Sequence, residues 1–444
     1  MTQEVLKSEL DLFKNVTFQG SIESSQFIQY RPTSALTENS SIEFAIPLSA
    51  DEYLDLQNIY LWIKGKVVQT DGADFPADQN GRYSLINYAL NTIFDQLSIY
   101  LGGTLVSQSS KTYNYLAFIE AITQLSTNSG LTYLTAAGFN APFKNNDFNF
   151  ANVDTDLAEN YKGSKHFTLY GKIHGSIFNS DKLLLNGVPL HLIFTRAPQN
   201  FAVHGMPARA AVGAVAALAE ANPKYNLNEV SLFVRKVKLS PNLLNAHARA
   251  LQISKAIYPI KRSIVKVVNL PANQSSFVLD NVIMGQMPCK IVFGFVSDTQ
   301  FSGTNRTNPM MFSNHDLTFL CVHINGESFP KSPYQPDYRN DSKQYEREYF
   351  DFLMNIGATK SIAQPPIDYI NYAKGFCLYA FNFNSDFENP NESDYINIPK
   401  EGFLNIEVKF RANLANALKL IFYAQFDNVI EIDENRNVTV DYSG

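Results

Sequence analysis

Two stretches of the 444-residue sequence decide its fold: Leu97-Ser-Ile-Tyr-Leu-Gly-Gly103 and Phe319-Leu-Cys-Val-His-Ile-Asn-Gly326. Each begins as a short run of apolar and β-favouring residues, which predicts a strand. Each ends in a Gly-Gly or Asn-Gly pair, which supplies the positive φ angles of a tight hairpin turn. Beyond each turn lies a segment in which aromatic side chains recur at helical spacing. The same order of strand, turn and helix occurs twice, which indicates an internal repeat.

Two further pairs of landmarks extend this repeat. Upstream, Ile42-Glu-Phe-Ala-Ile-Pro47 resembles the stretch from Val265 to Pro271. Downstream, the stretches 190–196 and 406–411 are both alternating strands that end in an arginine. The members of each pair are separated by nearly the same number of residues as the two turns. Unrelated β proteins also share such patterns, but three landmarks in one order favour a duplicated unit of about half the chain.

Alternation with period two, as in Ile406-Glu-Val-Lys-Phe410, predicts strands with one buried face. The 33 Phe and 23 Tyr residues supply the aromatic side chains that pleated, half-buried surfaces favour. A β-sandwich or jelly roll is the natural form for each unit, because it buries one face of every strand. Apolar spacing of three and four predicts helices at 111–125 and 344–356. A third helix, 241–251, begins after a Ser-Pro pair and would join the two units.

Composition limits the possible classes of protein. The chain is 45% hydrophobic and 18% charged, which excludes a disordered chain. Its net charge of -6 means that any contact with nucleic acid is local. Cys289, Cys321 and Cys377 are scattered, which predicts no disulfide framework and a reducing compartment. The N-terminus has no apolar signal core, and the longest apolar run, 210–219, is too short to span a membrane. We therefore expect a soluble chain with no membrane insertion.

Motifs of the common enzyme classes are missing from the sequence. It contains no His-Glu-x-x-His, no phosphate loop, no Gly-x-Gly-x-x-Gly and no Gly-x-Ser-x-Gly elbow. No two of the seven histidines are two residues apart, which argues against a cupin-like metalloenzyme. The acidic residues Asp427, Glu431, Asp433 and Glu434 could bind a cation, but a solvated strand end explains them better. We predict no catalytic residues, no cofactor and no metal site.

Several stretches together resemble the major capsid proteins of Polinton (Maverick) elements and adintoviruses. The resemblance runs in order along the chain and is carried by Tyr30-Arg-Pro32, Ile42-Glu-Phe44, Tyr53-Leu-Asp-Leu56, Leu232–Pro241, Ala246-His-Ala-Arg249, Tyr258–Arg262, Val322–Glu327, Leu378–Phe381 and Phe426–Asp433. It covers residues 30 to 440, so it is more specific than any single motif. The Ala-rich stretch 208–221 departs from the family pattern and leaves the loop there uncertain, but not the fold.

The resemblance implies an all-β double jelly roll, with two tandem eight-stranded β-sandwich barrels and short helical insertions. It implies a structural protein that forms a homotrimer, a hexon-like, pseudo-hexameric capsomer, and an icosahedral shell around double-stranded DNA. Minor or penton capsid proteins would be partners, and DNA contact would be local at most. The protein would be found in the virion, after synthesis in the host cytoplasm and assembly in the host nucleus. The predicted division is an arm at 1–35, a first jelly roll at 36–240, a linker helix at 241–254 and a second jelly roll at 255–444.

Three segments are candidates for assembly contacts. The stretch 231–266 contains many cations and no acid, and a patch of this kind attracts phosphate or an acidic protein even on an acidic chain. Its candidate residues are Arg235, Lys236, Lys238, Arg249, Lys261 and Arg262. The alternative is that they pair with acidic loops such as 386–394. An N-terminal arm with Leu6, Leu10 and Phe13 at helical spacing would dock on a neighbouring capsomer, unless it is a frayed terminus.

The third segment is the Ala-rich stretch itself. Alanine is the best helix former, and Pro207 and Pro223 bracket the stretch, which predicts a helix of a few turns. A helix this apolar makes a poor surface, so we expect Ala214 and Ala217 to contact a partner subunit or the second jelly roll. Without the resemblance, the alternative function is a two-domain β-sandwich that binds carbohydrate or hydrolyses glycosides, because a catalytic pair of carboxylates is brought together only in space.

Overall fold

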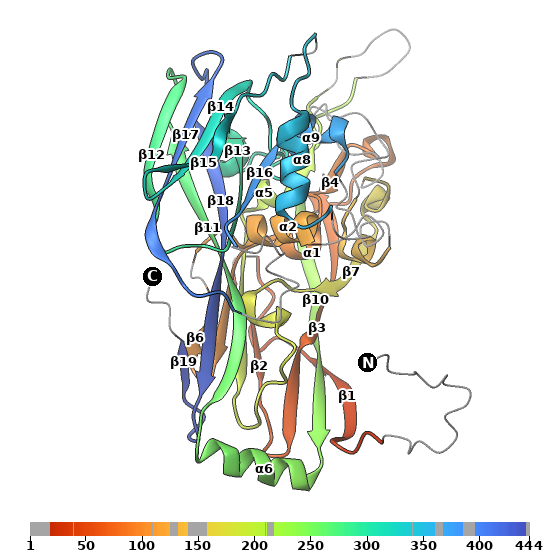
Figure 1. The fold of residues 1–444 in the computed structure, drawn as a ribbon. Helices are drawn as coiled ribbons and strands as arrows, with labels where there is room; N and C mark the ends of the chain where they lie inside the picture. Colours follow the sequence, from red (N-terminus) through yellow and green to blue (C-terminus); the bar gives the residue numbers. More distant parts are fainter. Residues whose placement is uncertain are drawn as a thin grey trace, which may run out of the picture.

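The structure is a computed structural model of the chain. It describes residues 18–38, 40–107, 110–124, 132–140, 158–208, 210, 217–339, 341–359, 367–384 and 396–440. Most regular structure in these ranges is β-strand, and short helices lie between the strands (Figure 1). The all-β prediction is confirmed. No helix within these ranges is long and apolar enough to cross a membrane.

The first lobe is a sandwich of two antiparallel four-stranded sheets. Sheet 1 has the strand order β1-β10-β3-β7 and sheet 2 the order β2-β8-β5-β6. The strand bounds are β1 Ile22–Tyr30, β2 Ile42–Ile46, β3 Glu52–Gln69, β5 Phe94–Leu101, β6 Thr104–Leu105, β7 His166–Lys172, β8 Leu190–Arg196 and β10 Pro223–Leu239. A small pair, β4 (Tyr83–Leu85) and β9 (Val203–Gly205), lies beside them. Alternating residues such as Leu61, Ile63 and Leu232 fill the core between the sheets.

The second lobe repeats this arrangement. Sheet 3 has the order β11-β18-β13-β16 and sheet 4 the order β12-β17-β14-β15. The strand bounds are β11 Ala256–Leu270, β12 Ser276–Gln286, β13 Lys290–Ser297, β14 Leu317–Ile324, β15 Glu327–Tyr334, β16 Leu378–Asn382, β17 Glu401–Phe410, β18 Leu418–Ile432 and β19 Val438–Val440. The last of these, β19, pairs with the end of β18. Phe293, Phe381 and Phe422 stack inside this sandwich.

The two lobes match strand for strand. Replacing β1, β2, β3, β5, β6, β7, β8 and β10 by β11 to β18 in turn converts the strand orders of sheets 1 and 2 into those of sheets 3 and 4. This shared order is that of a jelly roll, so the chain is a double jelly roll as predicted. The turn landmarks are also matched: Gly102-Gly103 joins β5 to β6, and Asn325-Gly326 joins β14 to β15.

One landmark of the predicted repeat is wrong. The stretch 42–47 contains β2, whose counterpart is β12, whereas 265–271 falls at the end of β11, the counterpart of β1. Alternating burial looks alike in neighbouring strands, and only the hydrogen-bonded order tells them apart. The arginine landmarks hold, because Arg196 ends β8 and Arg411 directly follows its counterpart β17.

The three predicted helices are all present: α2 at Tyr113–Gln124, α8 at Glu346–Asn355 and α6 at Pro241–Leu251. The linker α6 joins β10 to β11 at one end of the molecule (Figure 1). The remaining helices are short: α1 Ala89–Thr92, α5 Gln199–Ala202, α7 Asp298–Ser302, α9 Tyr369–Gly375, and the 3-10 turns η2 Ala77–Gln79, η3 Tyr133–Ala137, η4 Lys162–Ser164 and η5 Ser176–Asn179.

The predicted N-terminal arm at 1–35 requires a correction, since it contains a strand of the first sandwich. β1 pairs along its length with β10, so only residues before it can form an arm. The strand lacks clear apolar alternation because it is an edge strand with most side chains exposed. Leu6, Leu10 and Phe13 lie outside the described residues.

The predicted helix at 208–221 is wrong where the structure describes it. Ala217 is exposed, and residues 217–222 are not helical. The Ala221 N–H donates to the Met206 carbonyl at 3.0 Å, and Arg306 forms an ion pair with Glu220. These contacts hold the segment extended and outweigh the helix propensity of alanine. Ala214 lies outside the described residues.

Candidate functional site

A buried polar cluster joins the two lobes, and we call it the interlobe cluster. Its centre is Glu120 on α2, whose side chain is 1% exposed. One carboxylate oxygen lies 2.9 Å from His174 Nδ1, and the other accepts a hydrogen bond from the Tyr423 hydroxyl at 3.2 Å. His174 Nε2 lies 2.8 Å from the Tyr88 hydroxyl, and Tyr423 lies 2.9 Å from Ser263 Oγ. The cluster therefore links three first-lobe residues to β18 and β11 of the second lobe.

Burial sets the protonation of this cluster. It raises the pKa of Tyr88 and of Tyr423 well above the ordinary value, and the nearby Glu120 carboxylate adds to both shifts. Both phenols therefore keep their protons at neutral pH, and the Tyr423 hydroxyl donates a hydrogen bond to the Glu120 carboxylate. An acid, a histidine and a tyrosine in contact could perform proton transfer, so access to the cluster decides its role.

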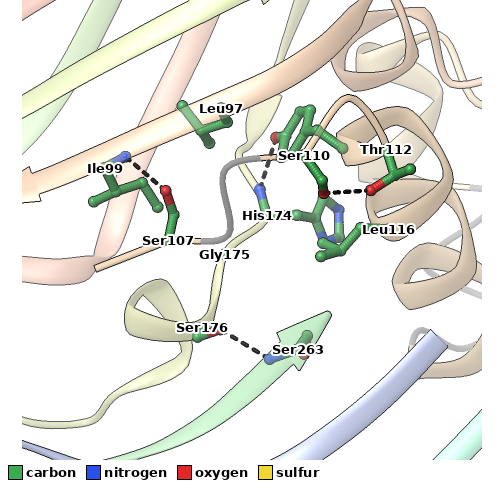
Figure 2. Close-up of a pocket in the computed structure, with 11 residues that line it drawn as sticks. Leu97, Ile99, Ser107, Ser110, Thr112, Leu116, His174, Gly175, Ser176 and Ser263 are labelled. Carbon is green, nitrogen blue, oxygen red and sulfur yellow. Dashed lines mark hydrogen bonds between the residues drawn. The ribbon is translucent and has the colours of Figure 1, made fainter. Parts of the chain in front are cut away.

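The cavity beside the cluster is too small for a substrate. Figure 2 shows it between the His174 loop, the start of α2 and the turn at Ser176. Its volume is about 30 Å³, which holds a water molecule or two. The Ser263 backbone N–H donates to Ser176 Oγ at 3.0 Å across the lobe junction. The cluster and its cavity thus connect the lobes, and they leave no room for chemistry on a ligand.

The sequence analysis missed this cluster, although a signal was present. Glu120 is the single charged residue of α2, in a segment that is otherwise mostly apolar. A lone acid on a helix without an exposed face requires a buried partner. The partner itself could not be identified, because Tyr423 lies 303 residues further along the chain.

A larger hollow of about 490 Å³ lies in the second lobe. Its lining includes Cys289, Phe329, Asn382, Ile398 and Asp427. Burial raises the pKa of the Cys289 thiol to about 12, so the thiol is protonated and a poor nucleophile. Asp427 forms an ion pair with Lys261 at 2.6 Å. The hollow is large enough for a ligand, and the two reactive groups named here are a protonated thiol and a carboxylate that is paired with a lysine.

The basic residues of β10 lie on sheet 1 of the first lobe, where each faces an acid. Arg235 is 2.8 Å from Asp55, Lys236 is 2.7 Å from Glu52, and Lys238 is 3.4 Å from Asp51. Arg235 is half-buried on the outward face, whereas Lys236 points inward and also donates to the Pro47 carbonyl at 2.9 Å. Burial alone would lower the pKa of Lys236, but its interactions with Glu52 and Tyr30 together outweigh burial and raise the pKa. The hydrogen bond from Lys236 lowers the pKa of Glu52.

The remaining basic candidates are spread over α6 and β11. Lys261 pairs with Asp427, and the guanidinium of Arg262 lies 4.7 Å from the centre of the Phe426 ring. Arg249 is exposed near the end of α6 and forms no ion pair within the described part of the chain. Several of the predicted cations are therefore neutralised by acids of their own chain. The acids in these ion pairs are Asp55, Glu52, Asp51 and Asp427, and the predicted loop 386–394 lies outside the described residues.

The other predicted sites can also be placed. Within the described ranges, no group of three or more His, Cys, Asp or Glu side chains could hold a metal ion. In the acidic cluster near the C-terminus, Glu431 forms an ion pair with Lys255 at 2.7 Å, and Asp433 accepts a hydrogen bond from Asn437. All three cysteines are buried with free thiols.

Comparisons with known proteins agree with this architecture. The fold is similar to that of a chain in the Sputnik virophage structure, with a TM-score of 0.65 and 13% identity over 100% of this chain and 93% of that one. It is also similar to the capsid of virus PBCV-1, with a TM-score of 0.59 and 11% identity over 97% and 100% of the two chains. The Faustovirus major capsid protein has a TM-score of 0.54 and 9% identity over 94% and 92%.

Sequence comparison adds one relative. An uncharacterized protein of Caenorhabditis elegans is 21% identical over 441 residues, which cover 95% of this chain and 98% of the relative. No family model matches the sequence. The fold and the comparisons define a class, the double jelly-roll proteins, in which this chain shares its architecture with proteins of viral capsids.

Proposed function

We propose that this protein is a structural major capsid protein. The observation that carries the proposal is the tandem pair of jelly rolls with one strand order, in a chain whose whole length matches the fold of virus capsid chains. Buried thiols, neutralised acids and a water-sized interlobe cavity argue for a structural role rather than an enzymatic one. Fold alone does not imply function, so assembly is the property to test.

We further propose that three copies form a pseudo-hexameric capsomer. A chain with two similar lobes presents six lobes when it trimerises, and six lobes tile a hexagonal lattice. Capsomers would then build an icosahedral shell around double-stranded DNA, together with a minor or penton protein. The resemblance to Polinton and adintovirus capsid proteins supports this more specific assignment.

Sedimentation velocity and negative-stain microscopy of the purified full chain test the proposal. A species of three times the 49.9 kDa chain mass, with threefold particles of six lobes, is the expected result. A monomer at micromolar concentration would contradict it. Binding to a glycan array by that monomer would instead support the carbohydrate-binding alternative.

The basic residues remain proposed contacts with DNA or with an acidic minor protein. Because four of the six basic candidates form ion pairs within the chain, we propose that Arg249 on α6 contributes most to any such contact. Replacing Arg249 with Gln is expected to lower DNA retention in assembled particles and to leave the trimer intact. Replacing the exposed Lys331 with Gln is the control, and equal DNA retention in both variants would remove the proposal.

A further inference from the structure

The two lobes are alike in topology but differ in what covers corresponding surfaces. Helix α2 follows the fifth jelly-roll strand of the first lobe, β6, and α8 follows its counterpart β15. All described side chains of α2 are buried, because the helix packs on its own lobe and also on β11 and β18 of the second lobe. α8 packs on β16 and α9, and its other face is open. That open face carries Phe350 and Met354, which are 57% and 41% exposed.

The next connection of each lobe shows the same difference. In the first lobe, η5 lies between β7 and β8 and packs against β11 of the second lobe. Its Ile177 is 2% exposed. In the second lobe, the connection between β16 and β17 contains Ile398, which is 86% exposed. Both second-lobe connections thus present apolar side chains where their first-lobe counterparts are buried against a neighbouring lobe.

The two sheets against which these connections would pack also differ, because one is covered within the chain and the other is not. In sheet 3, Val265 and Tyr423 point toward the first lobe and are fully buried. Sheet 1 corresponds to sheet 3, and among the residues that the structure describes the second lobe does not lie over the outward face of sheet 1 (Figure 1). We define the aromatic strip as four aromatic residues of this face, chosen one from each of its four strands: Phe27, Phe233, Tyr60 and Tyr170.

The strip is continuous and partly open to solvent. The Tyr60 and Tyr170 rings are stacked, with their centres 5.6 Å apart. The centre of the Tyr170 ring lies 5.8 Å from that of Phe233, and the centre of the Phe27 ring lies 6.0 Å from that of Tyr60. Phe27 is 54% exposed and Tyr170 is 39% exposed. An outward sheet face is ordinarily polar, and contiguous exposed aromatic side chains indicate an interaction surface.

We infer that the aromatic strip of one subunit is covered by the α8 and Ile398 surface of a second copy of this chain. Within one chain, α2 and η5 of the first lobe pack on sheet 3 of the second lobe. The proposed contact is the equivalent packing between two copies, with α8 and Ile398 of one copy on sheet 1 of the other. It buries the exposed apolar side chains of both surfaces in one step. Because the two surfaces differ, the contact is head-to-tail, and such contacts generate a ring when the rotation between successive subunits closes. The inference rests on the proposed capsid function and names the surfaces that would close its trimer.

Two double variants test the inference. The strip variant carries Phe27→Glu and Tyr170→Glu, and the helix variant carries Phe350→Glu and Met354→Glu. All four side chains are exposed, so circular dichroism spectra should match that of the unmodified chain. A control variant, Val278→Glu with Met284→Glu, places charges on exposed apolar positions of β12. Loss of interface anchors weakens association on the order of 30-fold or more.

We expect both the strip and helix variants to sediment as monomers and the control to remain trimeric. An equimolar mixture of the two monomeric variants retains one intact strip and one intact helix surface, so it should form dimers that cannot close. A trimer from either variant, or a mixture that stays monomeric at tens of micromolar, would overturn the inference. A monomer of the unmodified chain would instead contradict the proposed function.

Discussion

At the scale of single residues, Glu120 has the largest expected effect on stability. Its carboxylate accepts a hydrogen bond from the Tyr423 hydroxyl and contacts His174, and all three side chains are removed from bulk solvent. Glu120→Leu leaves the buried hydroxyl and imidazole without this partner, so we expect the free energy of unfolding to fall by about 2–4 kcal/mol. Urea unfolding measures the change. The exposed Glu229→Leu is the control and should change it by less than about 0.5 kcal/mol; equal effects would contradict the role of the cluster.

A second residue-scale prediction concerns His315, whose burial lowers its pKa from 6.5 to about 4. Below pH 6.5 the unfolded chain binds a proton that the folded chain does not, so stability falls as pH falls through this window. The shift corresponds to a loss of about 2–3 kcal/mol between pH 6.5 and 4.

His315→Asn tests this pH dependence. His315 has a φ of 47°, and asparagine tolerates this left-handed region better than most residues. Unfolding by urea at several pH values between 6.5 and 4 should show a smaller loss of stability in the variant than in the unmodified chain. Parallel curves for the two proteins would show that His315 does not titrate as expected.

At the scale of elements, the hairpin of β18 and β19 fastens the second lobe to the first. Arg436 in its turn donates to the carbonyl oxygen of Asn186 at 2.7 Å and to Asn186 Oδ1 at 3.0 Å. Thr104 Oγ1 donates to the Val438 carbonyl at 3.3 Å. The hairpin thus contacts first-lobe segments that lie 250 and 334 residues away in the sequence.

We expect Arg436→Ala to detach this hairpin. Loss of charged hydrogen bonds should lower the free energy of unfolding by about 1–3 kcal/mol. Hydrogen exchange should accelerate at Val438–Val440 and at the turn containing Asn186, because local opening there becomes easier. Lys331→Ala serves as the matched cation control, since Lys331 is 82% exposed. Unchanged exchange at β19 would refute the prediction.

At the scale of the whole molecule, assembly should depend on neither disulfides nor metal ions. The three thiols are buried and unpaired, and the described residues contain no cluster that could hold a metal. Treatment of the proposed trimer with dithiothreitol or with EDTA should leave its sedimentation coefficient unchanged, because the contacts proposed for it are apolar. Dissociation by either reagent would reveal a covalent or metal link between subunits.

Much of the fold was predictable because its signals are local. Alternating residues such as Ile406–Phe410 mark a strand wherever they lie, and the spacing in 111–125 and 344–356 marks a helix. The turns at Gly103 and Gly326 revealed the duplication. The sequence-based predictions were wrong where the conformation depends on distant partners. The edge strand β1 has little alternation, so its stretch was predicted to be part of an arm. The segment ending at Ala221 was predicted to be helical, but hydrogen bonds to other parts of the chain outweigh its helix propensity.

The sequence by itself determined the all-β class, the duplication and the linker helix, since periodicity, turn pairs and capping act over a few residues. Only the tertiary structure decided which strands correspond, which acids neutralise Arg235, Lys236 and Lys238, and that Glu120 meets Tyr423. It alone revealed the aromatic strip, whose four members come from strands that are distant in sequence and adjacent in sheet 1. Hydrogen bonds, ion pairs and ring contacts form between side chains close in space, and spacing along a chain does not specify such neighbours.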